Sequence, residues 1–481
     1  MGKPIKLNLF ILVLIINCLV HPGKAEINFD FKLSPLFSEN AVLQREKTIK
    51  IFGTAKPDSK IKLSLANKKS STKTNKDGTW LITLSPINAG GPYQLKASNE
   101  QKTLTVNNIY IGDVWISAGQ SNMVWFVDSA KNAEKNIAEA MDYNNKIFFL
   151  DLNIRPNEKA FSPFDKLGHA WYKVDSQTVK TLPAVPYAFA REIYNDQKVP
   201  IGIIQTATSN TQIQAHMSKE SLVGYKDLEK DKAHALEDRI IWYQTTFQST
   251  VPNTAINYFT LCIGEPSHQD DFTAFINDRK VINDFAYANC NKLDLRFLNQ
   301  INKIQIRVYP TKIKNITLND LATGFTKSKI IFNGQELILR NWETLPEISA
   351  NTPSSIFNVK INPITSYPIK GVLWYQGESN VNDYNSYKEL FRALVKDWRK
   401  RWHEELPFIT VQLHNFKTEK PENLLKFREV QSELSTKINK VYMIDAFDLS
   451  DEDLDVHPKN KDEVGYRLAL IAKKQLYKKS K

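Results

Sequence analysis

At 481 residues the chain is too long for a single hydrophobic core, so we expect two or three domains. Its apolar content of 42% is that of an ordinary globular protein rather than of a disordered or fibrous chain. The net charge is +12, but the lysines are scattered and do not interleave with aromatic residues as in a nucleic-acid groove. We therefore expect no nucleic-acid partner, and we assign the charge to solubility and to attraction for anionic surfaces or substrates.

Residues 1–25 have the pattern of a secretory signal peptide. Two lysines precede an apolar run from Leu7 to Val20, and Gly23 and Ala25 are small residues at the cleavage positions. The run is short for a membrane span and no later segment resembles one, so we expect a secreted or periplasmic protein with no transmembrane segment after the leader. Cys18 is an alternative lipid-attachment site, although Asn17 before it is a poor match to the usual small residue.

Residues 26–108 have the pattern of a small β-sandwich that forms an N-terminal domain. Apolar and polar residues alternate in Ile49–Phe52 and in Ile61–Leu65, and a further strand, Trp80–Leu84, follows a turn at Asp77-Gly78. Short strands at regular spacing with turn residues between them are typical of such sandwiches.

From residue 109 the pattern changes to strands that alternate with helices, which predicts a mostly parallel sheet covered on both faces. The clearest helix spans Tyr384 to Trp402, a polar helix-prone segment spans Ala130 to Met141, and a last helix follows Asn460. The candidate buried strands are Val114–Ser117, Ile201–Gln205, Gly371–Tyr375, Phe408–Leu413 and Val441–Asp445.

Between residues 250 and 362 this alternation breaks, and we interpret the segment as a β domain inserted into the α/β core. The core would then consist of residues 109–249 and 363–481, with residues 218–249 as a helical connector. The strand-like segments of the insert are Tyr258–Ile263, Phe272–Ile276, Ile304–Val308 and Lys329–Phe332. Cys262 and Cys290 could form a disulfide in an exported chain or remain as two free buried thiols. No cluster has zinc-ligand spacing, so we expect no metal.

The strand that begins at Gly112 ends in Ala-Gly-Gln and then reaches Ser121. A serine at the carboxyl end of a strand lies where open α/β sheets place their chemistry, although a structural helix-capping serine has the same pattern. Two later segments supply possible partners: the strand and polar turn Gly371–Asn380, and Asp455–Asn460 before the last helix. A nucleophile, a polar strand-end loop and a late histidine near an aspartate are the components of a serine hydrolase.

Three motifs in this order, GQSNM, WYQGESN and DVHPKNKDEVGYRLAL, resemble the sialate O-acetylesterase group of the SGNH hydrolases. The resemblance extends over nearly the whole mature chain. It implies an α/β, SGNH or flavodoxin-like, three-layer core that is interrupted by an inserted β domain and preceded by an N-terminal β-sandwich. It also implies a secreted serine esterase that removes O-acetyl groups from sugars without a metal or organic cofactor. Sialate is the implied substrate, and acetylated xylan, pectin or other glycans are alternatives because substrate loops are not decoded by one sequence.

The resemblance assigns Ser121 as the nucleophile and His457 as its base. Asp455 is our choice to orient His457. The wider SGNH group places its aspartate three residues before the histidine, where this chain has Leu454, but the closer family uses the D-x-H-P form found here. Asp451 and Asp453 are nearby alternatives that are more often solvated loop charges.

An acyl-transfer site also needs donors that face the developing oxyanion. The candidates are the backbone N–H of Ser121, the loop after Ile201–Gln205 and the side chain of Gln376. The backbone can approach closely at Gly377, whereas Glu378 and Asn380 either bind sugar hydroxyls or brace their loop.

The loop after Ile201–Gln205 differs from the family. Relatives usually carry Gly-Gly-Thr there, followed by a Glu and a Trp, whereas this chain has Ser209 and Asn210 at the glycines and Gln214 and His216 at the other two positions. Asn tolerates a positive φ better than most residues, so a backbone donor can persist in an altered acyl pocket. The alternative is a glycan-binding module with a decayed active site. A protease or lipase lacks support because the G-x-S-x-G elbow is absent at Ser121.

Overall fold

The structure is a computed structural model that describes residues 30–477 except 153, 155, 158, 166–169, 226–240, 249–257, 264–270, 278, 283–289, 295–297, 299, 300, 310–326, 333 and 346–349. The expected signal peptide, residues 1–25, and Cys18 lie outside the described residues. In the part that is described, no helix has both the length and the apolar character needed to cross a membrane.

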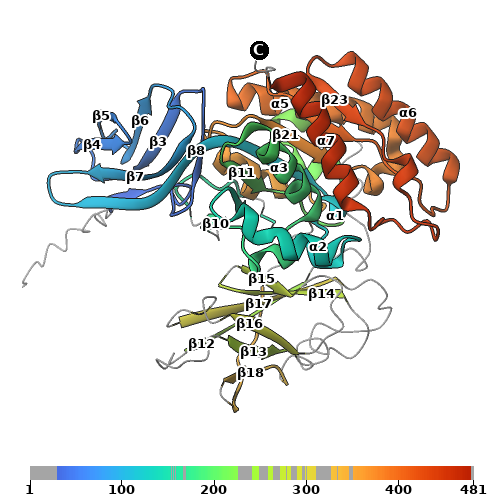
Figure 1. Cartoon of the computed structure of the whole chain (residues 1–481), viewed down its shortest axis with the longest axis horizontal. Helices are drawn as coiled ribbons and strands as arrows, with labels where there is room; N and C mark the ends of the chain where they lie inside the picture. Colours follow the sequence, from blue (N-terminus) through green and yellow to red (C-terminus); the bar gives the residue numbers. More distant parts are fainter. Residues whose placement is uncertain are drawn as a thin grey trace, which may run out of the picture.

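The N-terminal segment consists of strands, seen at one end of the molecule in Figure 1. One sheet has the order β1-β3-β6, and the remaining strands join the long strand β8. Ile51 and Trp80 of the first sheet and Leu63 and Leu95 of the second are buried in one core, because the alternating apolar residues of each sheet face the other sheet. The strands are β1 (Lys32–Leu33), β2 (Val42–Gln44), β3 (Ile49–Thr54), β4 (Lys60–Leu65), β5 (Lys68–Lys73), β6 (Thr79–Leu84), β7 (Gly90–Ser98) and β8 (Thr103–Gly119).

Strand β8 connects this segment to the central sheet, whose order is β10-β9-β11-β8-β21-β22-β23. It therefore runs through the boundary expected at residues 108 and 109 without a break. From β9 to β23 neighbouring strands are parallel, and only β10 at the edge pairs antiparallel. The strands are continuous apolar runs because both faces of the sheet are covered. They are β9 (Ile147–Asp151), β10 (Tyr172–Lys173), β11 (Ile201–Gln205), β21 (Gly371–Tyr375), β22 (Phe408–Val411) and β23 (Val441–Ile444).

Helices cover both faces of the central sheet (Figure 1). On one face Trp115 of β8 packs against Phe189 of α3, with 4.9 Å between ring centroids. Trp374 of β21 packs against Trp398 of α5 on the opposite face, because Trp374 lies three residues beyond Gly371, the register partner of Trp115. The helices are α1 (Ser121–Val124), α2 (Ala133–Ala138), α3 (Ala184–Gln197), α5 (Tyr384–Trp402), α6 (Pro421–Lys437) and α7 (Lys461–Leu476).

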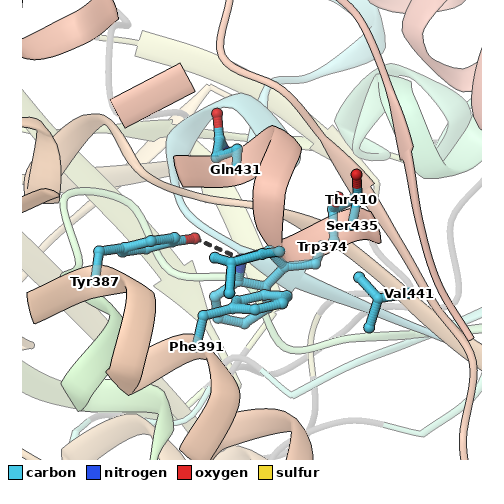
Figure 2. Close-up of a pocket in the computed structure, with 8 residues that line it drawn as sticks. Trp374, Tyr387, Phe391, Thr410, Gln431, Ser435 and Val441 are labelled. Carbon is cyan, nitrogen blue, oxygen red and sulfur yellow. Dashed lines mark hydrogen bonds between the residues drawn. The ribbon is translucent and has the colours of Figure 1, made fainter. Parts of the chain in front are cut away.

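A small cavity lies between α5, α6 and the sheet (Figure 2). Its lining is mostly apolar, and the indole N–H of Trp374 donates to the hydroxyl of Tyr387 at 3.2 Å. None of its lining residues is one of the predicted site residues. The cavity is therefore part of the core packing.

The segment from β12 to β20 forms two antiparallel sheets below the central sheet in Figure 1. Their orders are β15-β14-β17-β12-β20 and β16-β13-β18-β19, and their apolar residues form a separate core. Cys262 and Cys290 are register partners on β13 and β16 and form a disulfide. The strands are β12 (Ile241–Gln248), β13 (Tyr258–Cys262), β14 (Asp271–Ile276), β15 (Arg279–Ile282), β16 (Cys290–Asp294), β17 (Ile301–Tyr309), β18 (Lys329–Phe332), β19 (Gln335–Ile338) and β20 (Glu343–Leu345).

The ends of this β segment differ from the expected limits of 250 and 362. Residues 241–248, expected in a helical connector, form strand β12, in which Tyr243, Thr245 and Phe247 are buried. This alternation has the period of a strand and not of a helix. At the other end Phe357 and Ile361 pack into the core of the central sheet rather than into that of the insert.

Candidate active site

Ser121 lies at the carboxyl end of β8, next to the carboxyl end of β21. After β8 the chain continues to β9, toward one edge of the sheet, and after β21 it continues to β22, toward the other edge. Open α/β sheets form a binding crevice at the point where two neighbouring strands diverge in this way. The turn requires a glycine at position 119. Its φ is +133°, and the Cβ of any other residue at this position would lie 2.0 Å from the carbonyl oxygen of Tyr375. Gln120 N–H donates to that same oxygen at 3.0 Å.

The helix that follows Ser121 is shorter than the sequence indicates. Helix α1 ends at Val124, and α2, within the predicted helical segment Ala130–Met141, is a separate element. Four residues form only one turn and supply a small dipole. Support for an oxyanion at Ser121 therefore comes from individual backbone N–H groups rather than from the dipole of a long helix.

His457 comes from the loop between β23 and α7, and its Nε2 lies 2.8 Å from Ser121 Oγ. Its side chain is 18% exposed, and Trp125 stacks on it with 5.0 Å between ring centroids and 25° between planes. If Nδ1 carries the proton, Nε2 can accept the hydroxyl hydrogen of Ser121. The two residues are 336 positions apart in sequence and meet only in the fold.

Asp455 holds the backbone of this loop more closely than it holds the imidazole. Its Oδ1 accepts from the backbone N–H of His457 at 2.6 Å, whereas 3.7 Å separates Oδ1 from His457 Nδ1. The second distance is too long for a hydrogen bond. The two alternative acids also accept from loop backbone groups: Asp453 from Asp455 N–H, and Asp451 from Lys459 N–H.

The loop after β21 places Gln376, Gly377 and Asn380 in internal contacts. Gln376 Nε2 donates to Asn380 Oδ1 at 2.8 Å and to the carbonyl oxygen of Thr211 at 3.0 Å, and Asn380 Oδ1 also accepts from Ile213 N–H. Gln376 is fully buried, so its amide hydrogens join this loop to the loop after β11. At Gly377, with φ +153°, a Cβ would lie 2.5 Å from the ring of Phe427.

The loop after β11 lies beside the nucleophile turn, since Thr208 N–H donates to the carbonyl oxygen of Gly119 at 3.0 Å. Ser209 is partly buried, and Asn210 is exposed with a φ of +54°. Asn210 thus occupies the left-handed region that its residue type tolerates. Asn351 fixes the loop by donating to the carbonyl oxygen of Asn210 and accepting from Gln212 N–H.

His216, where relatives carry a Trp, is a core residue. It is fully buried, its Nε2 lies 2.9 Å from Thr211 Oγ1, and its ring packs edge-on against Trp374. Burial lowers the pKa of His216 to about 3, so the ring is neutral at ordinary pH.

A buried polar group that the sequence interpretation missed connects the site residues. Asn122 Nδ2 donates to Glu378 Oε1 at 2.5 Å and to the carbonyl oxygen of Val456 at 2.9 Å, and Lys461 Nζ donates to Asn122 Oδ1. Burial raises the pKa of Glu378, and Asn122 and Lys461 oppose that rise. One signal was available: Lys461 lies three and seven residues before Val464 and Leu468, on the apolar face of α7.

A second missed residue is His414, after β22. Its Nδ1 lies 3.2 Å from the hydroxyl of Tyr375, and its Nε2 lies 3.2 Å from the carbonyl oxygen of Asp455. Burial lowers its pKa to about 3. A neutral ring that accepts from Tyr375 and donates to Asp455 O satisfies both contacts.

The arrangement can activate a serine hydroxyl with a neighbouring imidazole. Within the residues that the structure describes, no group of three or more His, Cys, Asp or Glu side chains could hold a metal ion. The site is thus built from a strand-end serine, a loop histidine and side chains that hold their two segments together.

Comparisons with known proteins place the chain in a family of carbohydrate esterases. The family described as "Carbohydrate esterase, sialic acid-specific acetylesterase" matches residues 111–261 and 350–474, so most of the inserted β segment falls in the gap. The sialate O-acetylesterases of Mus musculus and Homo sapiens are each 24% identical over 93% of this chain, which corresponds to 74% and 71% of their own lengths. A carbohydrate acetylesterase from Xanthomonas citri has a similar fold, with a TM-score of 0.64, 23% identity, and coverage of 93% of this chain and 76% of that chain.

Proposed function

Because this chain belongs to the carbohydrate esterase family of sialic acid-specific acetylesterases, which are carboxylic ester hydrolases, we propose that it is a secreted serine esterase that removes O-acetyl groups from sugars. The observation that supports this most directly is the 2.8 Å contact between Ser121 Oγ and His457 Nε2 at the end of β8. That contact pairs a nucleophile with a base at the position where the fold forms its crevice.

In the proposed reaction Ser121 Oγ attacks the acetyl carbonyl while His457 Nε2 takes the hydroxyl proton. The tetrahedral oxyanion is stabilised by backbone N–H groups of the nucleophile turn and of the Ser209–Asn210 loop. His457 then gives its proton to the sugar oxygen as the bond between that oxygen and the acetyl carbon breaks. The sugar departs with a free hydroxyl, and the acetyl group remains as an ester on Ser121. Water activated by His457 releases acetate and restores the serine.

We assign distinct roles to the remaining predicted residues. Asp455 positions the loop of His457 through the backbone and stabilises the imidazolium by its charge. Gln376 and Asn380 brace the loops on either side of Ser121, since Gln376 contacts Asn380, Gln120 and the carbonyl oxygen of Thr211, and Asn380 accepts from Ile213 N–H. Glu378 is partly exposed, and we assign it contact with a sugar hydroxyl in addition to its bond with Asn122.

We propose O-acetylated sialate as the substrate, on the basis of the curated relatives that carry that name. Other acetylated glycans are the alternative, because the loop from Thr208 to His216 differs from the family pattern. We also propose that residues 1–25 direct export and that β12–β20 form a separate inserted domain, which its own apolar core supports.

The test is acetate release by protein lacking residues 1–25, with 4-nitrophenyl acetate and a panel of O-acetylated sialates, xylan and pectin. Ser121→Ala and His457→Ala should each lower kcat/KM by at least about 10³-fold, because either change removes the nucleophile–base pair. The control is His403→Asn, an exposed histidine with φ +53° at the end of α5, which should leave kcat/KM unchanged. Glycan binding without turnover on any substrate would instead identify a binding module.

A further inference from the structure

Lys461 is a buried lysine close to the Ser121–His457 pair. It is fully buried at the first position of α7, on the face that also carries Val464 and Leu468. A buried ammonium is costly unless charged or polar groups compensate it. Burial lowers the pKa of Lys461 to about 7, and the attraction of Glu378, Asp451 and Asp455 opposes this shift.

The contact of Lys461 with Asn122 determines how the Asn122 amide is oriented. An ammonium can only donate, so the group that faces Lys461 Nζ must be Asn122 Oδ1. The two hydrogens of Nδ2 then point at Glu378 Oε1 and at the carbonyl oxygen of Val456, at 2.5 and 2.9 Å. In this orientation both amide hydrogens of Asn122 and its carbonyl oxygen have a hydrogen-bond partner.

These contacts join the two segments whose separation matters for proton transfer. Asn122 follows Ser121 in the chain, and Val456 precedes His457. Lys461 also lies near the indole of Trp125, with Nζ 5.5 Å from the ring centroid, and that indole stacks on His457. Lys461 therefore contacts Asn122 and Trp125 of the segment that follows Ser121, and these two residues in turn contact Val456 and His457.

We propose that Lys461 is a positioning residue which, by fixing the amide orientation of Asn122, holds the Ser121 turn and the His457 loop at hydrogen-bonding distance. This inference rests on the proposed esterase function. Removing the lysine takes the donor from Asn122 Oδ1 and positive charge from the neighbourhood of Glu378, so some loss of fold stability is expected as well. The positioning role is therefore read from the rate of the chemical step in folded protein.

The experiment is a double-mutant cycle with Lys461→Met and Asn122→Ala, assayed on 4-nitrophenyl acetate. Lys461→Met keeps the length of the side chain, and we expect kcat to fall about 10- to 100-fold while KM changes by less than about twofold, as for a misplaced catalytic group. Since Lys461 acts through Asn122, the double variant should be no slower than Asn122→Ala alone. The melting temperature of Lys461→Met should fall, because Asn122 Oδ1 loses its donor, so kcat is measured well below that temperature on protein shown to be folded.

Two further variants complete the design. Lys461→Gln keeps a neutral donor and should give a kcat between those of Lys461→Met and the unmodified protein; it replaces Lys461→Met in the cycle if that variant does not fold. Lys474→Met changes an exposed lysine of the same helix and should leave both kcat and the melting temperature unchanged.

The rate at which a fluorophosphonate modifies Ser121 is measured in parallel, because it reports the activation of the serine without substrate turnover. Absence of acetate release by the unmodified protein would refute the proposed function, whereas slower modification in Lys461→Met would still support the positioning role. Unchanged kcat and unchanged modification rate in a folded Lys461 variant would overturn the inference. The inference would also be overturned if the fold-losses in kcat of Lys461→Met and Asn122→Ala multiplied in the double variant, because the two residues would then act independently.

Discussion

Ser121 and His457, the proposed nucleophile and base, are held by two regions of different construction. Ser121 follows a strand that is buried on both faces, and the neighbouring loops are joined by the buried amides of Gln376 and Asn380. His457 lies in a partly exposed loop whose acids accept hydrogen bonds from loop backbone groups, as Asp455 does from His457 N–H. The nucleophile is thus placed by core packing and the base by local polar contacts. Disturbing the first region should cost stability, and disturbing the second should cost mainly activity.

The largest effect is expected for Gly119→Ala in the nucleophile turn. The new Cβ would lie 2.0 Å from the carbonyl oxygen of Tyr375 at a φ of +133°, so the end of β8 would have to move away from β21. We expect a loss of at least about 3 kcal/mol in the free energy of unfolding, measured by urea denaturation, together with loss of esterase activity.

Gly334→Ala is the matched control, because Gly334 also has a positive φ, +77°, but has open space where the Cβ would lie. It should cost only about 1 kcal/mol, the backbone term alone. If both variants lost the same free energy of unfolding, the contact between a Cβ at position 119 and the backbone of β21 would not be the cause of the loss.

A smaller effect is expected for Asp455→Asn in the loop of the base. The amide oxygen can still accept from His457 N–H, but the charge near Nδ1 is lost. We expect kcat/KM to fall about 10- to 100-fold with little change in stability, less than the roughly 10⁴-fold effect known for a buried triad aspartate. Asp453→Asn removes the same charge two residues away and should change kcat/KM by less than about threefold. A 10⁴-fold loss in Asp455→Asn would show that the carboxylate closes on Nδ1 when substrate binds.

The smallest effect concerns the pH dependence of stability. It arises from two buried histidines, His216 near the Ser121 region and His414 near the His457 loop. Burial lowers the pKa of both His216 and His414 to about 3, whereas an unfolded histidine titrates near 6.5. Below pH 6.5 the unfolded chain therefore binds protons that the folded chain does not, and stability falls as the pH falls toward 3. Each histidine should contribute up to about 1.4 kcal/mol per pH unit to this slope.

Urea denaturation between pH 7.5 and 5 checks this with His216→Gln and His414→Gln. Each variant should show a flatter slope than the unmodified protein. Only His414→Gln should also lower kcat, because His414 supports the carbonyl of Asp455 and His216 does not. An unchanged slope in both variants would show that the rings become protonated without unfolding the chain.

Much of the fold could be predicted from local sequence. Strands β11 and β21 and helix α5 begin and end at the residues that the apolar pattern indicates. The α/β character, predicted from strands that alternate with helices, is confirmed by the order of strands and helices, and the carbohydrate esterase family, inferred from three motifs, is confirmed by the family match. The helical connector predicted over residues 218–249 is wrong at residues 241–248, which form β12 and alternate in a strand period, whereas its residues 226–240 and 249 lie outside the described part of the chain.

The composition of the site was only partly predictable. Ser121 and His457 stand out because their motifs carry chemistry, and both contacts of the Asp455 carboxylate are with His457, two positions away. The contact between Asn122 and Lys461 joins positions 339 residues apart, and although both lie inside the family motifs, no local pattern indicates that the two side chains meet. Asn122 and Lys461 are close only because the fold places the start of α7 next to the turn at residues 119–122.

The sequence by itself determined the periodicity of the elements, the strand-end serine and the order of the motifs, because these depend on neighbouring residues. Only the tertiary structure decided that Gln376 braces a loop, that His216 is a neutral core residue and that Lys461 is buried near the serine. The physical reason is that hydrogen-bond partners, burial and pKa depend on groups brought together from distant parts of the chain. Local sequence fixes which groups are available, and the packing of the sheet and helices fixes what each group contacts.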